Sequence, residues 1–209
     1  MNLNSQQLTA LLLRCCSQIK EAAAELNALD GQLGDGDLGA TLEKCARLTE
    51  TALIAQPQDI SSVFQTASMA CVRASGSSFG TLLGIALVTA AKQTAGQTEL
   101  QADTVPALLR AVLEALMARG GASLGDKTVL DALQALIDAL ESQPVAAWPQ
   151  AAPRAVAEAL DTFRQQPNKI GRARMFAGRS VGLDDPGMVA FAHLVRAAVA
   201  RTLPLQEAH

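Results

Sequence analysis

Residues 5–29 read SQQLTALLLRCCSQIKEAAAELNAL, and apolar side chains recur in this stretch every three or four positions. The recurring residues are Leu8, Leu11, Leu12, Cys15, Ile19, Ala22, Leu26 and Leu29. This spacing places them on one face of an α-helix of about six turns, with Ser5 as the expected N-cap. The stretch therefore predicts a long amphipathic helix that packs on a core through a single apolar face.

The same helical spacing recurs along the rest of the chain. It occupies the ranges 40–54, 58–75, 78–95, 104–119, 127–142, 147–165 and 186–202, each bounded by glycine, proline or polar residues. Thr104 before Val105-Pro106 and Asp184-Asp185 before Pro186 are typical of helix starts with proline in the first turn. Since amphipathic helices with short connections pack as antiparallel neighbours, the predicted fold is all-α, an eight-helix up-and-down bundle or barrel.

Composition supports one helical domain covering residues 1–209. The chain is long enough to bury one sizeable core, while an aromatic content of 3% and the absence of tyrosine disfavour strands. A net charge of −3 gives no general attraction to nucleic acid or to anionic membranes, so neither partner is expected. With no basic leader and no apolar run of about 18 residues, a cytoplasmic protein is expected. Four cysteines lack zinc-site spacing and are predicted to be reduced core residues.

Four connections are polar and contain glycine: 30–41, 74–81, 119–128 and 171–187. They follow the first, third, fifth and seventh predicted helices. In an up-and-down bundle, alternate connections lie at the same end. The sequence therefore predicts that these four converge into one ligand site at one end of the bundle.

The first of these connections begins LDGQLGDGDLG, residues 29–39. Asp30, Asp35 and Asp37 repel one another at close range unless a hard cation neutralises them, and magnesium takes oxygen ligands of this kind. An EF-hand starting at Asp35 is excluded, because the oxygen ligand, glycine and glutamate that it requires at fixed positions are absent. The alternative is an N-cap, in which Asp35 or Asp37 caps the following helix. The loop alone leaves both interpretations open.

The other three connections each have a functional and a structural interpretation. ASGSSFGT (74–81) begins a helix whose backbone N–H groups favour phosphate, but serine-rich caps are also common. RGGASLGDKT (119–128) offers a turn, a cation and a hydroxyl, or caps the next helix. GRARMFAGRSVGLDDPG (171–187) is long for a connection, and its three arginines suit phosphate oxygens, with a solvated basic loop as the alternative.

Taken in order, LDGQLGDGDLG, ASGSSFGT, RGGASLGDKTVLDAL and GRARMFAGRSVGLDDPG resemble the L subunit or L domain of dihydroxyacetone kinases. The resemblance covers nearly the whole chain. It implies an eight-helix barrel that carries ADP or ATP at one end, with two magnesium ions between aspartate side chains and the phosphates. This agrees with the convergence of connections that follows from helix order alone.

The resemblance also implies roles for individual residues. The metal ligands would be Asp30, Asp35 and Asp37, and Arg172 would supply catalytic positive charge. The nucleotide contacts would be Leu38, Gly39, Ala40, Thr41, Ala74, Ser75, Gly120, Val129, Arg172, Asp185, Pro186 and Gly187. The chain departs from the family at Leu38, where a histidine is usual, so any polar contact from that histidine is lost.

The implied function is that of the nucleotide-binding half of a two-component kinase. In this family a separate K subunit holds the short ketose through a histidine, whereas the two histidines here lie outside the loops, and His193 is expected to be a packing residue. Bound ADP would be rephosphorylated by a phosphotransferase-system protein, or ATP would exchange. The alternatives are a non-catalytic ADP-binding module that regulates a transcription regulator or partner kinase, and a bundle with no ligand. The ketose and the oligomeric state stay open, and a homodimer is compatible with the sequence.

Overall fold

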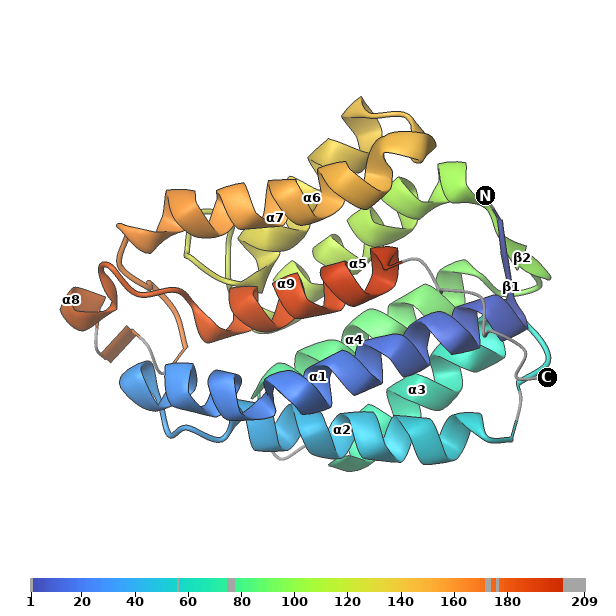
Figure 1. The fold of residues 1–209 in the computed structure, drawn as a ribbon, viewed down its shortest axis with the longest axis horizontal. Coiled ribbons are helices and arrows are strands. Elements are labelled where there is room, and N and C mark those ends of the chain that lie inside the picture. The colour runs from blue at the N-terminus through green and yellow to red at the C-terminus, as the bar shows by residue number, and fades with distance from the viewer. Residues whose placement is uncertain (1, 56, 75–77, 172–173, 176, 201–209) are drawn as a thin grey trace, which may run out of the picture.

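The computed structural model describes residues 2–55, 57–74, 78–171, 174–175 and 177–200 of the chain, and helices dominate this part (Figure 1). The helices are α1 (Ser5–Leu33), α2 (Leu38–Leu53), α3 (Ile60–Ala74), α4 (Ser78–Gln93), α5 (Val105–Gly120), α6 (Val129–Ser142), α7 (Trp148–Arg164), α8 (Ala177–Ser180) and α9 (Pro186–Val199). Short 3₁₀ turns, Ala102–Thr104 and Val145–Ala147, precede α5 and α7. The eight long helices match the eight predicted segments, and α8 is an additional short helix inside the fourth connection.

The long helices form a closed ring. Each of α1 to α6 packs against the next helix in the chain, α7 packs against α9, and α9 returns to α1 (Figure 1). The apolar face of α1 packs on the core, as predicted. Ile19 and Leu26 of α1 are buried in one cluster with Leu42 of α2 and Ala190 of α9. The predicted antiparallel helical barrel is confirmed.

The start of α1 differs from the prediction by one residue. Asn4, not Ser5, is the N-cap: its side chain accepts a hydrogen bond from the Gln7 backbone N–H at 2.9 Å, and the Gln7 side chain accepts from the Asn4 N–H at 3.0 Å. This reciprocal capping box satisfies two backbone donors that the helix leaves unpaired. Asn4 also pairs in a two-residue strand, β1 (Leu3–Asn4), with β2 (Glu99–Leu100), an antiparallel contact too short for any periodicity to predict.

The end of α1 also differs, with a consequence for the site. The helix runs to Leu33, one turn beyond Leu29, so Asp30 lies on its last turn rather than in a free loop. The first connection is therefore short and has its first carboxylate fixed on a rigid element. Because α1 begins at the β1–β2 pair and ends at the first connection, the predicted site lies at the opposite end of the barrel from this pair (Figure 1).

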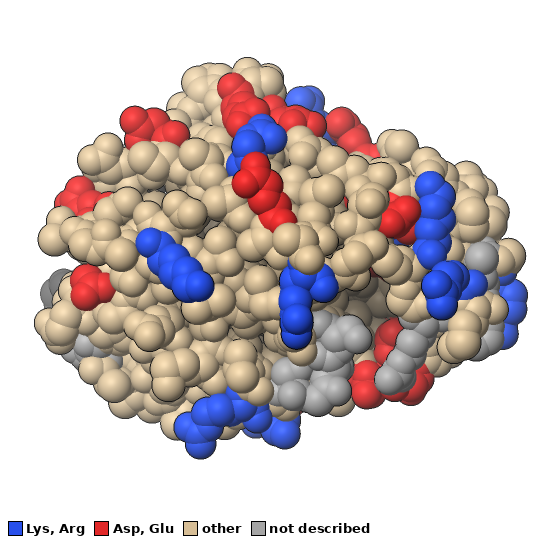
Figure 2. Space-filling model, turned by 180° about the vertical axis from the view of Figure 1, so that it is seen from behind, with Lys and Arg blue, Asp and Glu red and all other residues tan. Residues whose placement is uncertain are grey.

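The four cysteines are buried and free, as predicted. Burial raises the pKa of the Cys15 thiol to about 11 and that of Cys16 to about 12, so both remain protonated at neutral pH. No helix in the described part of the chain is both long enough and apolar enough to cross a membrane. Basic and acidic side chains are interspersed on the face in Figure 2, so this face of the barrel carries no extended patch of one charge.

Candidate metal and phosphate site

The four connections meet at one cavity of about 220 Å³, as the helix order predicts. Its lining comes from all four regions of the chain: Asp30, Leu33, Asp35, Asp37, Leu38, Phe79, Leu82, Thr128, Val129, Ile170, Gly171, Asp185, Pro186 and Gly187. One part of this wall is acidic and another is apolar. Such a division suits a ligand with a charged end and a flat apolar end.

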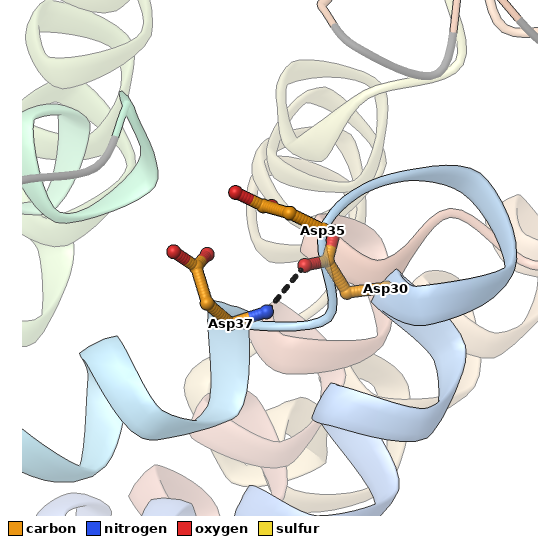
Figure 3. Close-up of side chains that lie close together, drawn as sticks. All are labelled: Asp30, Asp35 and Asp37. Carbon is orange, nitrogen blue, oxygen red and sulfur yellow. Dashed lines mark hydrogen bonds between the residues drawn. The ribbon is translucent and has the colours of Figure 1, made fainter.

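Three carboxylates make the acidic part. Asp30, Asp35 and Asp37 each offer one oxygen, and the three oxygens lie within 4.8 Å of one another (Figure 3). Carboxylates at this separation repel one another in water, and an all-oxygen donor set of this size suits a hard divalent cation. The donor chemistry therefore fits magnesium.

Within this cluster, Asp30 caps a helix with its side chain and Asp37 does not. The Asp30 carboxylate oxygen Oδ2 accepts hydrogen bonds from the N–H groups of Asp37 at 3.0 Å and of Leu38 at 3.3 Å (Figure 3). Asp30 thus caps α2 from the neighbouring helix. Asp37 occupies the N-cap position, but its side chain makes no capping hydrogen bond. Of the two caps that the alternative interpretation names, Asp35 and Asp37, Asp37 is therefore not a side-chain cap.

The first turn of α2 is held against α1 by direct backbone contact. A Cβ atom on Gly39 would lie 1.9 Å from the carbonyl oxygen of Ala23, so only glycine fits at this position. Beside it, Asn27 Oδ1 accepts from the Ala40 N–H at 3.0 Å. Gly39, Ala40 and Thr41 lie on this turn behind the cavity, while Leu38 lines it. The close approach of α1 and α2 fixes the carboxylates relative to one another.

The second connection contributes through the start of α4. Phe79 and Leu82 line the cavity, and the Phe79 ring packs so closely on Gly187 that a Cβ there would lie 3.0 Å from its Cε2 atom. Ala74 is buried beside Cys45 and Cys71 rather than in the cavity wall. Ser75, which the sequence assigns to phosphate, lies outside the described residues.

In the third connection, Thr128 caps the next helix, as the structural interpretation predicts. The Thr128 side chain accepts from the Leu130 N–H, and Asp131 accepts from the Thr128 N–H at 2.8 Å, which completes a capping box on α6. Thr128 and Val129 also line the cavity. Gly120 lies at the exposed end of α5 and does not line it. Lys127, one of the cations of this connection, is fully buried, does not line the cavity and donates to backbone carbonyls.

The fourth connection brings Asp185, Pro186 and Gly187 to the cavity at the start of α9. Asp185 is the N-cap, as predicted: Oδ1 accepts from the Met188 N–H and Oδ2 from the Asn168 side chain, both at 2.9 Å. Burial nevertheless raises the pKa of Asp185 to about 6. Arg172, the residue assigned to catalysis, lies outside the described residues.

The raised pKa of Asp185 predicts a pH dependence of stability. Between pH of about 4 and 6 the native state binds more protons than the unfolded state, so the unfolding free energy falls as pH rises through this window, by up to about 3 kcal/mol. Asp185→Asn keeps an acceptor for the cap and removes the titration. We expect the urea unfolding free energy of the wild type to fall relative to that of the variant between pH 4 and pH 6.5, and parallel profiles would contradict this.

His193 lies away from the cavity. The sequence predicts a packing residue, and the structure places it half-buried between α9 and α1, where Nε2 lies 3.0 Å from a Glu25 carboxylate oxygen and Nδ1 lies 3.5 Å from the Gln18 amide. It therefore bridges two helices through polar contacts in addition to packing. Nothing in this arrangement directs it toward a ligand.

Sequence reasoning missed six lining residues. They are Leu33, Phe79, Leu82, Thr128, Ile170 and Gly171. Most are apolar or lie on helices, so residue type alone assigns them to packing or capping. Their one sequence signal is position: Leu33, Phe79, Thr128 and Gly171 lie inside the four motifs, and Leu82 and Ile170 are directly next to one.

Comparison with known proteins agrees with this geometry. The profile of the DAK2 domain matches residues 32–200. The D-erythrulose kinase of Mycolicibacterium smegmatis is 35% identical over 85% of this chain and 32% of its own length. The ADP-binding subunit DhaL of the PTS-dependent dihydroxyacetone kinase of Lactococcus lactis is 31% identical over 85% of this chain and 87% of its own. This chain thus spans about a third of the first relative and most of the second.

Among solved structures, the dihydroxyacetone kinase of C. freundii in complex with AMP-PNP and Mg²⁺ superposes with a TM-score of 0.74. The two share 25% sequence identity, and the match covers 91% of this chain and 33% of that one. The helical ring described above is therefore the fold of that region of the kinase.

Proposed function

The chain belongs to the DAK2 domain family, and from this membership we propose that it is the nucleotide-binding subunit of a two-component kinase. Its acceptor would be a short ketose held on a separate K subunit. The observation that carries the proposal is the meeting of three aspartate carboxylates with the starts of α2, α6 and α9 around one cavity. Phosphoryl transfer requires neutralised phosphate oxygens and fixed alignment rather than a protein nucleophile, and this arrangement would supply both once the carboxylates hold magnesium.

Asp30, Asp35 and Asp37 would hold two magnesium ions. Such ions neutralise phosphate charge and align the transferred group. Asp30 is fixed on α1 and shares its carboxylate with the N-terminus of α2, which orients the cluster before any ion binds. The match to a kinase crystallised with AMP-PNP and Mg²⁺ supports this assignment.

ADP or ATP would lie across the cavity from the carboxylates to the apolar wall. Its phosphates would face the helix starts at Leu38–Thr41 and Ala74–Ser75, with Arg172 adding positive charge. Its adenosine would lie against Val129 and the Asp185–Gly187 turn, with Gly120 nearby. The apolar side chains of Phe79, Leu82 and Ile170 extend this wall and suit a flat base.

The partners would be the K subunit and a phosphotransferase-system protein that rephosphorylates bound ADP. The lactococcal relative, described as the ADP-binding subunit of a PTS-dependent kinase and matched over most of its length, supports this division of labour. A regulatory ADP-binding module is the second candidate, and Leu38 in the cavity wall favours it, since the family usually has a histidine there.

Reconstituted transfer distinguishes these two functions. The chain, loaded with ADP, would be mixed with its K subunit, the phosphotransferase proteins, phosphoenolpyruvate, and dihydroxyacetone or erythrulose. We expect a ketose phosphate to form only when both the chain and the K subunit are present. A loaded chain that gives no product with a K subunit proven active beside another L subunit would contradict the kinase and favour the module.

A further inference from the structure

Lys127 is a fully buried lysine with an unusual backbone. Its exposed fraction is 0%, and its φ of +62° lies in the left-handed region that residues other than glycine rarely adopt. Its ammonium group donates to three backbone carbonyls, those of Arg164 at 3.2 Å, Gln166 at 2.8 Å and Ser180 at 2.8 Å. An ammonium has three donors, so this set of carbonyls uses all of them.

Two of the carbonyls lie at helix ends. Arg164 is the last residue of α7 and Ser180 the last residue of α8. Each of these carbonyls also accepts a backbone hydrogen bond, from the Gly182 N–H at 2.8 Å and from the Leu183 N–H at 3.2 Å, so the lysine is their second donor. Burial lowers the pKa of Lys127, while the nearby carboxylates of Asp185 and Asp184 oppose that effect. The lysine therefore joins the ends of two helices through one buried charge.

Asn168 connects the same segments from the other side. Its N–H donates to the Ser180 hydroxyl oxygen at 2.9 Å, and its side-chain amide donates to the Lys127 carbonyl and to Asp185 Oδ2, each at 2.9 Å. Asn168 is 2% exposed, and its Oδ1 atom is buried with no hydrogen-bond partner among the described residues. We name Lys127 and Asn168, with their hydrogen-bond partners, the buried clamp.

Lys127 and Asn168 do not line the cavity, but their chain neighbours and one of their partners, Asp185, do. Thr128 and Val129 follow Lys127 directly, Ile170 and Gly171 follow Asn168 by two and three residues, and Asp185 is a member of the clamp. Within the described residues, the clamp thus fixes the base of the fourth connection against the start of α6. Both sides of this junction form the apolar wall of the cavity.

We infer that Lys127 is a positioning residue for the nucleotide, acting through the buried clamp to hold the apolar wall in register with the acidic cluster. This inference rests on the proposed function, since it takes ADP as the ligand. Lys127 itself touches neither phosphate nor metal. Its loss should therefore weaken nucleotide binding while leaving the three carboxylates in place.

The test is isothermal titration of ADP at saturating Mg²⁺ into the full-length chain and its Lys127→Met variant, at a temperature where circular dichroism shows both folded. We expect the Kd for ADP to rise about 10- to 100-fold, by analogy with the loss of metal affinity when a residue that orients metal ligands is removed. Val63→Ala is the matched control, because Val63 is fully buried in the core at the opposite end of the barrel. The Kd of Val63→Ala should equal that of wild type even if its thermal midpoint falls as far as that of Lys127→Met.

The outcomes separate the inference from the function on which it rests. Wild type that binds no ADP would overturn both. Wild type that binds, with a Lys127→Met Kd no higher than that of Val63→Ala, would overturn the positioning role alone. Should Lys127→Met fail to fold, Asn168→Ala carries the test: a raised Kd supports the buried clamp, and a Kd within about twofold of wild type overturns it.

Discussion

Asp37→Ala is expected to remove magnesium-dependent nucleotide binding and leave the fold unchanged. The Asp37 carboxylate belongs to the three-oxygen cluster but makes no capping hydrogen bond. Losing one charged ligand should raise the Kd for ADP with Mg²⁺ by about 100-fold or more, about 3 kcal/mol. Because the side chain is exposed and like charges surround it, the thermal midpoint should stay within about 2 °C of wild type. Calorimetric titration and thermal unfolding measure the two effects.

Asp30→Ala is the matched control, because it should affect stability as well as nucleotide binding. It removes a carboxylate from the same cluster together with two hydrogen bonds to the start of α2. We expect it to lose nucleotide as Asp37→Ala does, but also to lose about 1–2 kcal/mol of stability, as removal of an N-cap does. Equal thermal midpoints for the two variants would contradict the cap assigned to Asp30. Retained ADP affinity in both would contradict the metal site.

Gly39→Ala is expected to have the largest effect on stability. Its Cβ would lie 1.9 Å from the Ala23 carbonyl oxygen, an atom of the α1 backbone that cannot move without displacing the helix. Forcing α1 and α2 apart should cost about 3 kcal/mol or more, which lowers the thermal midpoint by about 6–12 °C. Nucleotide affinity should fall too, because Asp30 on α1 and Asp37 on α2 would separate.

Gly31→Ala is the control. It tests whether the loss of stability depends on the position of Gly39 or follows from replacing any glycine in this region. Gly31 lies in α1, and the nearest atom to a Cβ there is the Gly36 Cα at 3.8 Å, an ordinary contact. Alanine favours the helix over glycine, so this variant should gain about 0.5–1 kcal/mol. If Gly39→Ala unfolds at the same temperature as Gly31→Ala, the close approach of α1 and α2 is not a constraint.

The helices and their convergence follow from local rules. Apolar spacing predicts a helix over 78–95, and the structure has one over Ser78–Gln93. Proline after Asp185 predicts the start of α9, and the side chain caps it. Helix order alone then predicts that the four connections meet, as they do at the cavity. Each of these features depends on contacts within one helix or on the order of the helices along the chain.

What escaped prediction depends on contacts between helices. Apolar spacing places Asp30 in a connection, and only the packing of α1 on α2 makes it the cap of α2. Sequence alone shows only that the third connection contains cations, and the burial of Lys127 depends on carbonyls that lie about 40 residues further along the chain. Residue type suggests what these side chains can do. The fold decides which atom each one meets.

Mass spectrometry of nucleotide released on denaturing the purified wild-type chain tests the central claim most directly. Asp37→Ala, purified in the same way, is the control. We expect ADP from the wild type and none from the variant. A wild-type chain that releases no nucleotide, and that binds neither ADP nor ATP when magnesium is added, would contradict it.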